Sequence, residues 1–278
     1  MKRLRIVTLI LAITMAAPTL LNAQIIKGEA FLGGNATQVD GDECFGYKRF
    51  GIHAGAGALI PVTSFMDVGL EVLFNQRGAF KRDSITYNST FPYAYNLRLN
   101  YAEVPLMIYL TDKGNYSVGL GVSYGRVVGL SEKNDGIPTG IGLGDGKLTW
   151  KDSRYKDIDL SDISSLEQLS EVVYGTANLP DTISVTEVIA NSNTYRKDDI
   201  TFLASLRVRV YEGFHAELRY QYSIRPIRTR LFYQNNVMTL PAEVRLQYNN
   251  SLTLRLVYIF NEHRSASNKE ASKKGKTM

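Results

Sequence analysis

The sequence predicts an all-β protein, an eight-stranded antiparallel up-and-down transmembrane β-barrel with long extracellular loops. Three observations support this prediction. The chain opens with a stretch typical of a secretion signal, and about eight later segments alternate apolar and polar residues with the period of a β-strand. The connections between these segments are alternately short and long, as in bacterial outer-membrane barrels, which have short periplasmic turns and long outer loops.

Residues 1–23 have the features of a cleaved signal peptide. A basic start over residues 2–5 precedes an apolar run over residues 6–21, and Ala23 is a small residue suited to a cleavage site. A membrane anchor is the alternative, but a spanning helix needs about 20 apolar residues, and Pro18 interrupts this run. We therefore expect export of the rest of the chain.

The predicted barrel covers residues 24–260, and alternation places each of its strands. The strands cover residues 25–34, 50–60, 65–76, 97–110, 116–125, 200–210, 214–224 and 250–260. In the first strand, Phe31 shares a face with Lys27 and Glu29, so the pattern there is weak. Because side chains alternate between the two faces of a strand, the apolar face should meet lipid and the polar face should line the lumen.

The second and third predicted strands each have one apolar face. Even-numbered residues are apolar from 52 to 60 and from 68 to 74, whereas His53 and Glu71 belong to the opposite faces.

The fourth predicted strand contains a change of phase. Odd-numbered residues are apolar from 97 to 101, whereas even-numbered residues are apolar from 104 to 110. One extra residue would reconcile the two halves, so we predict a β-bulge near Ala102 and Glu103. Pro105 cannot donate to the ladder and fits such an irregular position.

The last four predicted strands repeat the pattern more clearly. In the fifth, the even-numbered residues from 116 to 124 are large, and glycine or serine alternates with them. Small residues on the inner face leave room inside a narrow cylinder. In the sixth, seventh and eighth strands, apolar residues occupy even positions from 202 to 210, from 214 to 224 and from 252 to 260.

The connections set the expected orientation. Those after the second, fourth and sixth strands are short, so both termini are expected in the periplasm, the carboxyl end as a basic tail over residues 261–278. The longest connection, a loop insert over residues 131–199, contains a short predicted helix over residues 162–173 with Ser161 as its cap. Tyrosines near strand ends suit an interfacial aromatic belt: Tyr101, Tyr116, Tyr124, Tyr248 and Tyr258.

Charged side chains of the polar faces should meet inside the barrel. An eight-stranded barrel is just wide enough for its side chains to fill it, and charges without access to water must pair. The predicted lumen ion network comprises Glu29, Glu71, Arg98, Glu103, Arg207, Arg209, Glu217, Arg219 and Arg255. A narrow pore or ligand site is the alternative, and the excess of arginine would favour anions in any open path.

Aromatic residues in the long connections could form a contact surface for a partner, because aromatic residues are enriched in protein interfaces. The candidates are Phe91, Tyr93, Tyr95, Phe232 and Tyr233. They would equally suit the rim of the membrane.

The sequence predicts neither catalysis nor a cofactor or metal site. A hydrolase needs a nucleophile, a histidine and a carboxylate within reach of one another, and no nucleophile is indicated beside His53, His215 or His263. Acidic residues of the loops lack the spacing of a calcium site. Removal of the signal takes away three of the 32 basic residues, and the rest nearly balance the 27 acidic residues. A nucleic-acid partner is therefore not expected. The single Cys44 is expected to be a free thiol.

At 33–35 (Gly-Gly-Asn) and 101–107 (Tyr-Ala-Glu-Val-Pro-Leu-Met) the chain resembles the PorT-like outer-membrane β-barrel family. The resemblance extends over roughly residues 25–260 and implies an eight-stranded barrel in the outer membrane of Gram-negative bacteria. It also implies an accessory or structural subunit of a secretion or assembly complex, with lipid around it and a protein partner at its loops. The alternative function is a small pore for small solutes, including anionic ones. No catalytic residues are implied.

Overall fold

The computed structural model describes residues 26–42, 44–82, 94–112, 115–134, 137–139, 141–146, 149–150, 189–190, 194–233 and 242–262. The predicted signal peptide, the predicted helix over residues 162–173 and nearly all of the predicted tail lie outside these residues. Among the residues described, no helix has the length and apolarity needed to cross a membrane.

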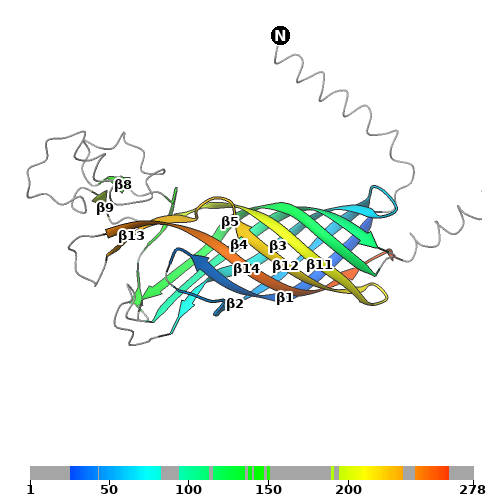
Figure 1. The fold of residues 1–278 in the computed structure, drawn as a ribbon, viewed down its shortest axis with the longest axis horizontal. Coiled ribbons are helices and arrows are strands. Elements are labelled where there is room, and N and C mark those ends of the chain that lie inside the picture. Colours follow the sequence, from blue (N-terminus) through cyan, green and yellow to red (C-terminus); the bar gives the residue numbers. More distant parts are fainter. Residues whose placement is uncertain are drawn as a thin grey trace, which may run out of the picture.

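Eight long strands form a closed antiparallel barrel, as the alternation predicted (Figure 1). They are β1 (Lys27–Asp40), β2 (Arg49–Pro61), β3 (Met66–Lys81), β4 (Tyr95–Asp112), β5 (Tyr116–Asn134), β11 (Asp198–Tyr211), β12 (Phe214–Ser223) and β14 (Ala242–Ile259). Each strand pairs with the next along the chain, and β1 pairs with β14 to close the cylinder. Closure gives every barrel strand two neighbours, as a β-structure in lipid requires.

Among the residues described, six short strands lie in the long connections. They are β6 (Ile137–Pro138), β7 (Leu143–Gly144), β8 (Thr149–Trp150), β9 (Ile189–Ala190), β10 (Tyr195–Arg196) and β13 (Arg228–Tyr233). β13 pairs with the first part of β14, so this hairpin continues past the barrel rim. We call this end of the cylinder the loop end, and the opposite end, with the three short connections, the turn end.

The strands are longer at the loop end than the sequence predicted. β1 continues through residues 35–40, which were expected to be loop, and β5 continues to Asn134. The connection to β11 therefore spans residues 135–197 rather than 131–199. Their polarity made these extensions resemble loop, but cross-strand pairing with β14 and β2 holds residues of β1 such as Thr37 in the sheet.

The prediction of a β-bulge in β4 near Ala102 and Glu103 is wrong. β4 keeps a single phase, because its odd-numbered residues from 95 to 109 all face the lumen. The irregularity lies between β4 and β5, where Asn100 and Tyr101 pair with Gly129 and Val127, which leaves Val128 of β5 without a partner on β4. The apparent phase change arises because the outer side of β4 changes from apolar at residues 104–110 to polar at residues 96–100 toward the loop end, while apolar residues fill the lumen side there.

The outer face carries a band of exposed apolar side chains between two rows of aromatic residues. The loop-end girdle comprises Phe50, Phe74, Tyr124, Phe202 and Tyr220, and the turn-end girdle comprises Tyr116, Phe214, Tyr258 and Phe260. Such a band between aromatic girdles is typical of outer-membrane barrels. Tyr101, predicted in the aromatic belt, instead lies in the lumen with 1% of its surface exposed.

Small residues of β5 let large side chains cross the lumen. A side chain at Gly119 would meet the ring of Tyr109 at 2.7 Å and the hydroxyl of Ser205 at 2.4 Å. The expected room on the inner face of β5 is therefore occupied by Tyr109.

Leu254→Arg should destabilise the barrel by about 2–4 kcal/mol, because Leu254 lies within the lipid-facing band with 62% exposure and a charge there would be placed in hydrocarbon. Urea titration of protein refolded into vesicles, with the folded fraction read by gel mobility, measures this loss.

Thr63→Arg is the control, since Thr63 is exposed in a turn beyond the turn-end girdle. We expect a change of about 0–1 kcal/mol there. Equal losses in both variants would contradict the placement of the band.

Candidate functional site

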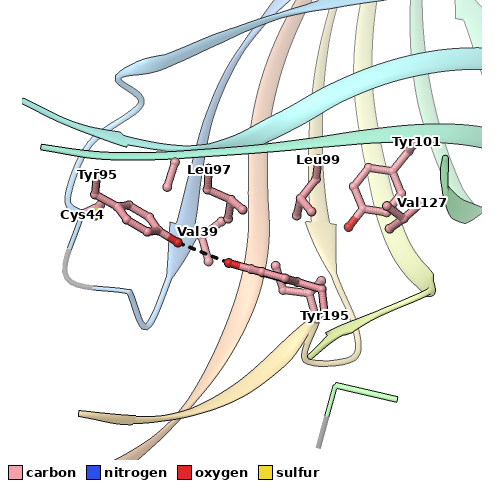
Figure 2. Packing of buried hydrophobic residues seen from close by; sticks show 10 residues of the cluster. Val39, Cys44, Tyr95, Leu97, Leu99, Tyr101, Val127 and Tyr195 are labelled. Atoms are coloured by element: carbon pink, nitrogen blue, oxygen red, sulfur yellow. Dashed lines mark hydrogen bonds between the residues drawn. The ribbon is translucent and has the colours of Figure 1, made fainter. Parts of the chain in front are cut away.

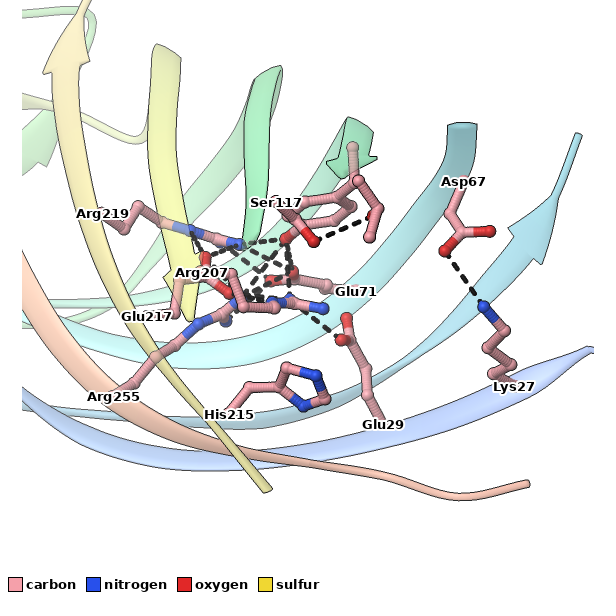
Figure 3. A network of polar contacts seen from close by, with 12 residues as sticks. Lys27, Glu29, Asp67, Glu71, Ser117, Arg207, His215, Glu217, Arg219 and Arg255 are labelled. Carbon is pink, nitrogen blue, oxygen red and sulfur yellow. Dashed lines mark hydrogen bonds and ion pairs between the residues drawn. The ribbon is translucent and has the colours of Figure 1, made fainter. Parts of the chain in front are cut away.

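The centre of the lumen holds a network of paired charges (Figure 3). The Glu71 carboxylate accepts hydrogen bonds from Arg219, at 2.7 Å from Nη2, and from Arg255, at 2.8 Å from Nη2. The Glu217 carboxylate binds the same two arginines and also Arg207, whose Nη2 lies 2.7 Å from Oε2. Two carboxylates therefore stand between three guanidinium groups.

Strand register explains why these groups meet. Glu217 of β12 lies directly opposite Arg255 of β14 and Arg207 of β11. Arg219 is two residues beyond Glu217 and points to the same side, because side chains alternate along a strand. Glu71 reaches them from β3, across the cylinder.

Aromatic rings and a third carboxylate complete the centre. Glu29 of β1 lies 3.1 Å from Arg207. The hydroxyl of Tyr109 donates to Glu71 at 3.1 Å and accepts from Arg219 at 2.9 Å. The guanidinium of Arg255 stacks 3.9 Å above the ring of Phe31, a favourable cation–π arrangement. Three carboxylates thus balance the three arginines.

A second layer of charge lies nearer the loop end. Arg77 of β3 is paired with Glu103 of β4 and with Asp199 of β11, at 3.1 Å from the latter. Gln221 donates to Glu103 at 2.9 Å, and Asn249 donates to Asp199 at 3.0 Å. Neutral amides therefore supply further donors to the two carboxylates.

The third layer is an apolar cluster at the loop end, which we call the loop-end plug (Figure 2). It comprises Val39, Cys44, Ala79, Tyr95, Leu97, Leu99, Tyr101, Val127, Tyr195 and Ile227. Tyr195 belongs to the long connection after β5, so this connection contributes a side chain to the interior of the barrel.

One buried carboxylate holds the loop-end plug to the hairpin. Glu132 of β5 accepts hydrogen bonds from Tyr95 at 2.6 Å and from Tyr195 at 2.9 Å. Arg228 of β13 lies 3.1 Å from Glu132 and stacks 4.1 Å above the Tyr195 ring. β4, β5, the long connection and β13 therefore converge on one ion pair.

The structure places most of the predicted lumen residues inside the barrel but places Arg98 and Arg209 outside the central network. Those with buried side chains are Glu29, Glu71, Glu103, Arg207, Glu217, Arg219 and Arg255. Arg98 is exposed on the outer face, so its assignment to the lumen is wrong and follows from the incorrect phase of β4. Arg209 lies at the turn end, 30% exposed and 3.6 Å from Glu262. It pairs outside the central network.

The prediction that Tyr95 belongs to a partner surface is wrong, because Tyr95 is buried in the loop-end plug with 1% exposure. Phe91 and Tyr93 lie outside the described residues. Phe232 and Tyr233 belong to β13, but their side chains are not among those described.

Sequence reasoning missed five residues that complete the lumen. They are Arg77, Tyr109, Glu132, Asp199 and Arg228, all buried. Tyr109 could have been found from the single phase of β4. Glu132 and Arg228 fall in stretches that were interpreted as loop, and no local pattern marks them.

A buried acid lies in the loop between β1 and β2. Asp42 is 1% exposed, and its Oδ1 accepts a hydrogen bond from the backbone NH of Cys44 at 2.7 Å. Burial raises the pKa of Asp42 from 3.8 to about 7, against the opposing effect of the backbone hydrogen bond from Cys44 and of Arg228 and Arg230. Cys44 is a buried free thiol, and burial raises its pKa well above the usual value.

Within the described ranges, no group of three or more histidine, cysteine or acidic side chains could hold a metal ion. His215 lies 3.3 Å from Glu262 near the turn end. His53 is fully buried, with its Nε2 3.4 Å from Arg255.

Comparison with known proteins finds similarity only among solved structures. No protein-family model matches the sequence. No curated protein matches it either. The attachment invasion locus protein Ail of Yersinia pestis is 10% identical, with 84% of this chain and 98% of that chain covered and a TM-score of 0.39.

Two other outer-membrane proteins give similar values. Neisserial surface protein A is 8% identical over 84% of this chain and 96% of that chain, with a TM-score of 0.36. OprG of Pseudomonas aeruginosa is 9% identical over 84% of this chain and 94% of that chain, with a TM-score of 0.32. The assignment of the fold rests on the strand pairing itself: the chain forms a closed eight-stranded antiparallel β-barrel with an apolar outer band.

Glu71→Gln should lower the free energy of unfolding by about 3–5 kcal/mol, because it leaves the guanidinium groups of Arg219 and Arg255 short of a buried counter-charge. Urea unfolding in vesicles measures the loss.

Asp67→Asn is the matched control, since it breaks the more accessible Lys27–Asp67 pair near the turn end. Its expected cost is about 1 kcal/mol or less. A loss at Glu71 no larger than that of the control would show that the central network does not stabilise the fold.

Opening of the β1–β2 loop should depend on pH through Asp42. Because folding raises the pKa of this carboxyl from 3.8 to about 7, protonation stabilises the closed loop, and that stability is lost as pH rises through about 7. Between pH 6 and pH 8, the opening constant should rise roughly tenfold. The rate at which a thiol reagent labels Cys44, divided by its rate with free cysteine at the same pH, measures the opening.

Asp42→Asn should make this normalised rate independent of pH over the same range. A rate equally dependent on pH in this variant would rule out Asp42 as its cause.

Proposed function

We propose that this protein is a non-enzymatic, non-conducting barrel that anchors a partner-binding surface in the outer membrane. Its loop end faces the cell exterior and both termini lie in the periplasm, because bacterial barrels have short turns on the periplasmic side. Its role is that of an accessory or structural subunit of an outer-membrane complex.

The filled lumen is the observation that carries this proposal. Two charged layers and the loop-end plug follow one another along the barrel. Five buried arginines each contact at least one carboxylate: Arg77, Arg207, Arg219, Arg228 and Arg255. An anion-selective pore would need cationic groups available to the solute, so the pairing favours the anchor over the pore.

The loop end supports a role in binding because backbone hydrogen bonds order it beyond the membrane band. Arg196 donates to the carbonyl of Ile227 at 2.8 Å, and Thr229 donates to that of Gly146 at 2.8 Å. The long connection is thereby attached to the β13–β14 hairpin. A surface ordered before binding costs less conformational entropy on association.

The resemblance to the PorT-like family favours a secretion or assembly complex as the setting. The residues that carry it face the lumen or its wall: a side chain at Gly33 would meet the carbonyl oxygen of Leu254 at 2.3 Å, and Tyr101 and Glu103 lie inside. These residues account for a barrel structure shared with that family, whereas a protein partner would contact the loop end.

Purified wild-type protein in planar bilayers should give no steady conductance, because the lumen is closed by paired charges and the loop-end plug. Reproducible channels of fixed conductance and anion selectivity would contradict the proposal in favour of a pore. The folded state is checked beforehand by its gel mobility without heating.

Binding is tested by gentle detergent extraction of tagged protein from its native membrane. We expect a defined protein assembly with wild type and its loss with Glu132→Gln, which removes the charge that joins Tyr195 and Arg228. Lys133→Gln is the control, since Lys133 is the exposed neighbour of Glu132. A lone barrel from wild-type cells would contradict the subunit role.

A further inference from the structure

Two arginines near the loop end differ from the paired arginines of the lumen. Arg49 is 8% exposed and donates from Nη1 to the amide oxygen of Asn96 at 2.9 Å, while its Nε has no hydrogen-bond partner. Arg98 is exposed and forms no ion pair with any of the residues described. By contrast, the exposed Arg126 lies 3.1 Å from Asp198.

A seam in the barrel wall brings these two arginines together. The pairing of β2 with β3 ends at His53 and Asn75, whereas β3 and β4 stay paired as far as Lys81 and Tyr95. Arg49, at the start of β2, spans this seam to reach Asn96 on β4.

Asn96 and Arg98 lie on the same face of β4, because they are two residues apart along a strand. Burial and the nearby charge of Arg98 both lower the pKa of Arg49, and no ion pair joins Arg49 to a carboxylate among the residues described. Two like charges, one of them almost buried, therefore share a site without a counter-ion from this part of the chain. A bound anion would offset both charges, since a buried charge needs a partner.

The site lies at the depth of lipid headgroups. Phe50 follows Arg49 directly and belongs to the loop-end girdle, with 76% of its surface exposed. Phe74 of the same girdle is on β3, the strand between β2 and β4. An anion at Arg49 and Arg98 would therefore lie just outside the hydrocarbon, with the Phe50 ring beside the acyl chains.

We infer that Arg49 and Arg98 bind the phosphate group of a lipid headgroup in the leaflet at the loop end. Guanidinium groups match phosphate oxygens in geometry and charge, and two of them can share one phosphate. The exposed Phe50 ring distinguishes a lipid from free phosphate, because only the lipid adds acyl contacts. This site is separate from the surface for a protein partner and needs only that the barrel is in its membrane.

The test is calorimetric titration of the full-length protein in neutral detergent with short-chain phosphatidic acid. Wild type should bind it at least about tenfold more tightly than the diacylglycerol of the same chains, and at least about tenfold more tightly than inorganic phosphate. Arg98→Gln should weaken binding of phosphatidic acid about tenfold or more. Because Arg98 is exposed, this variant should fold, as unheated gel mobility will verify.

Arg49→Gln should weaken binding as much as Arg98→Gln, and Arg126→Gln is the matched control, an outward arginine already paired with Asp198. Equal binding by wild type and Arg98→Gln would overturn the site. If Arg126→Gln weakens the binding of phosphatidic acid equally, the binding is due to general surface charge and not to this site. Inorganic phosphate that binds as tightly as phosphatidic acid would overturn the lipid as the ligand.

Discussion

The pairing of buried charge in the lumen is the interaction on which the rest of the structure depends. An eight-stranded barrel has an interior just wide enough to be filled by side chains. The polar faces of its strands therefore bring charged groups into contact with one another instead of with water. Glu71 and Glu217 take up this charge by each binding Arg219 and Arg255, and Glu29 offsets Arg207. Removal of any one member leaves another without compensation, so the network constrains all the strands that supply it.

A reversal of polarity marks where the barrel leaves the bilayer. Within the membrane band, the outer face is apolar, and the lumen holds the central charges together with a buried apolar cluster that includes Met107, Leu203 and Val257. Toward the loop end, exposed Arg98 and Arg126 face outward, whereas Leu97 and Leu99 are buried inside. The barrel there resembles a water-soluble β-protein, with an apolar core and a polar surface. The strands thus form two structures end to end, one adapted to lipid and one to water.

This reversal explains which parts of the fold could be predicted from the sequence. Period-two alternation placed all eight barrel strands and put Glu71, Glu217 and Arg255 on inner faces, because one rule holds throughout the membrane band. On β4 the same rule failed: the apolar side chains move from the outer to the inner face between Tyr101 and Val104, with no change in backbone phase. Partners such as Glu132 and Arg228, 96 residues apart, meet only through tertiary packing, which no local pattern encodes.

The filled lumen limits where this protein can act. When side chains occupy the interior, specificity must lie at the loop end or on the outer surface. At the loop end, the ion pair of Glu132 and Arg228 fixes the hairpin to the barrel, so a protein partner would meet an ordered surface. On the outer surface, Arg98 and the guanidinium of Arg49 lie near the loop end without an ion pair to any carboxylate among the described residues. Because the central charges of the lumen pair with one another, two arginines without a counter-ion among the described residues are the basis for the inferred lipid site.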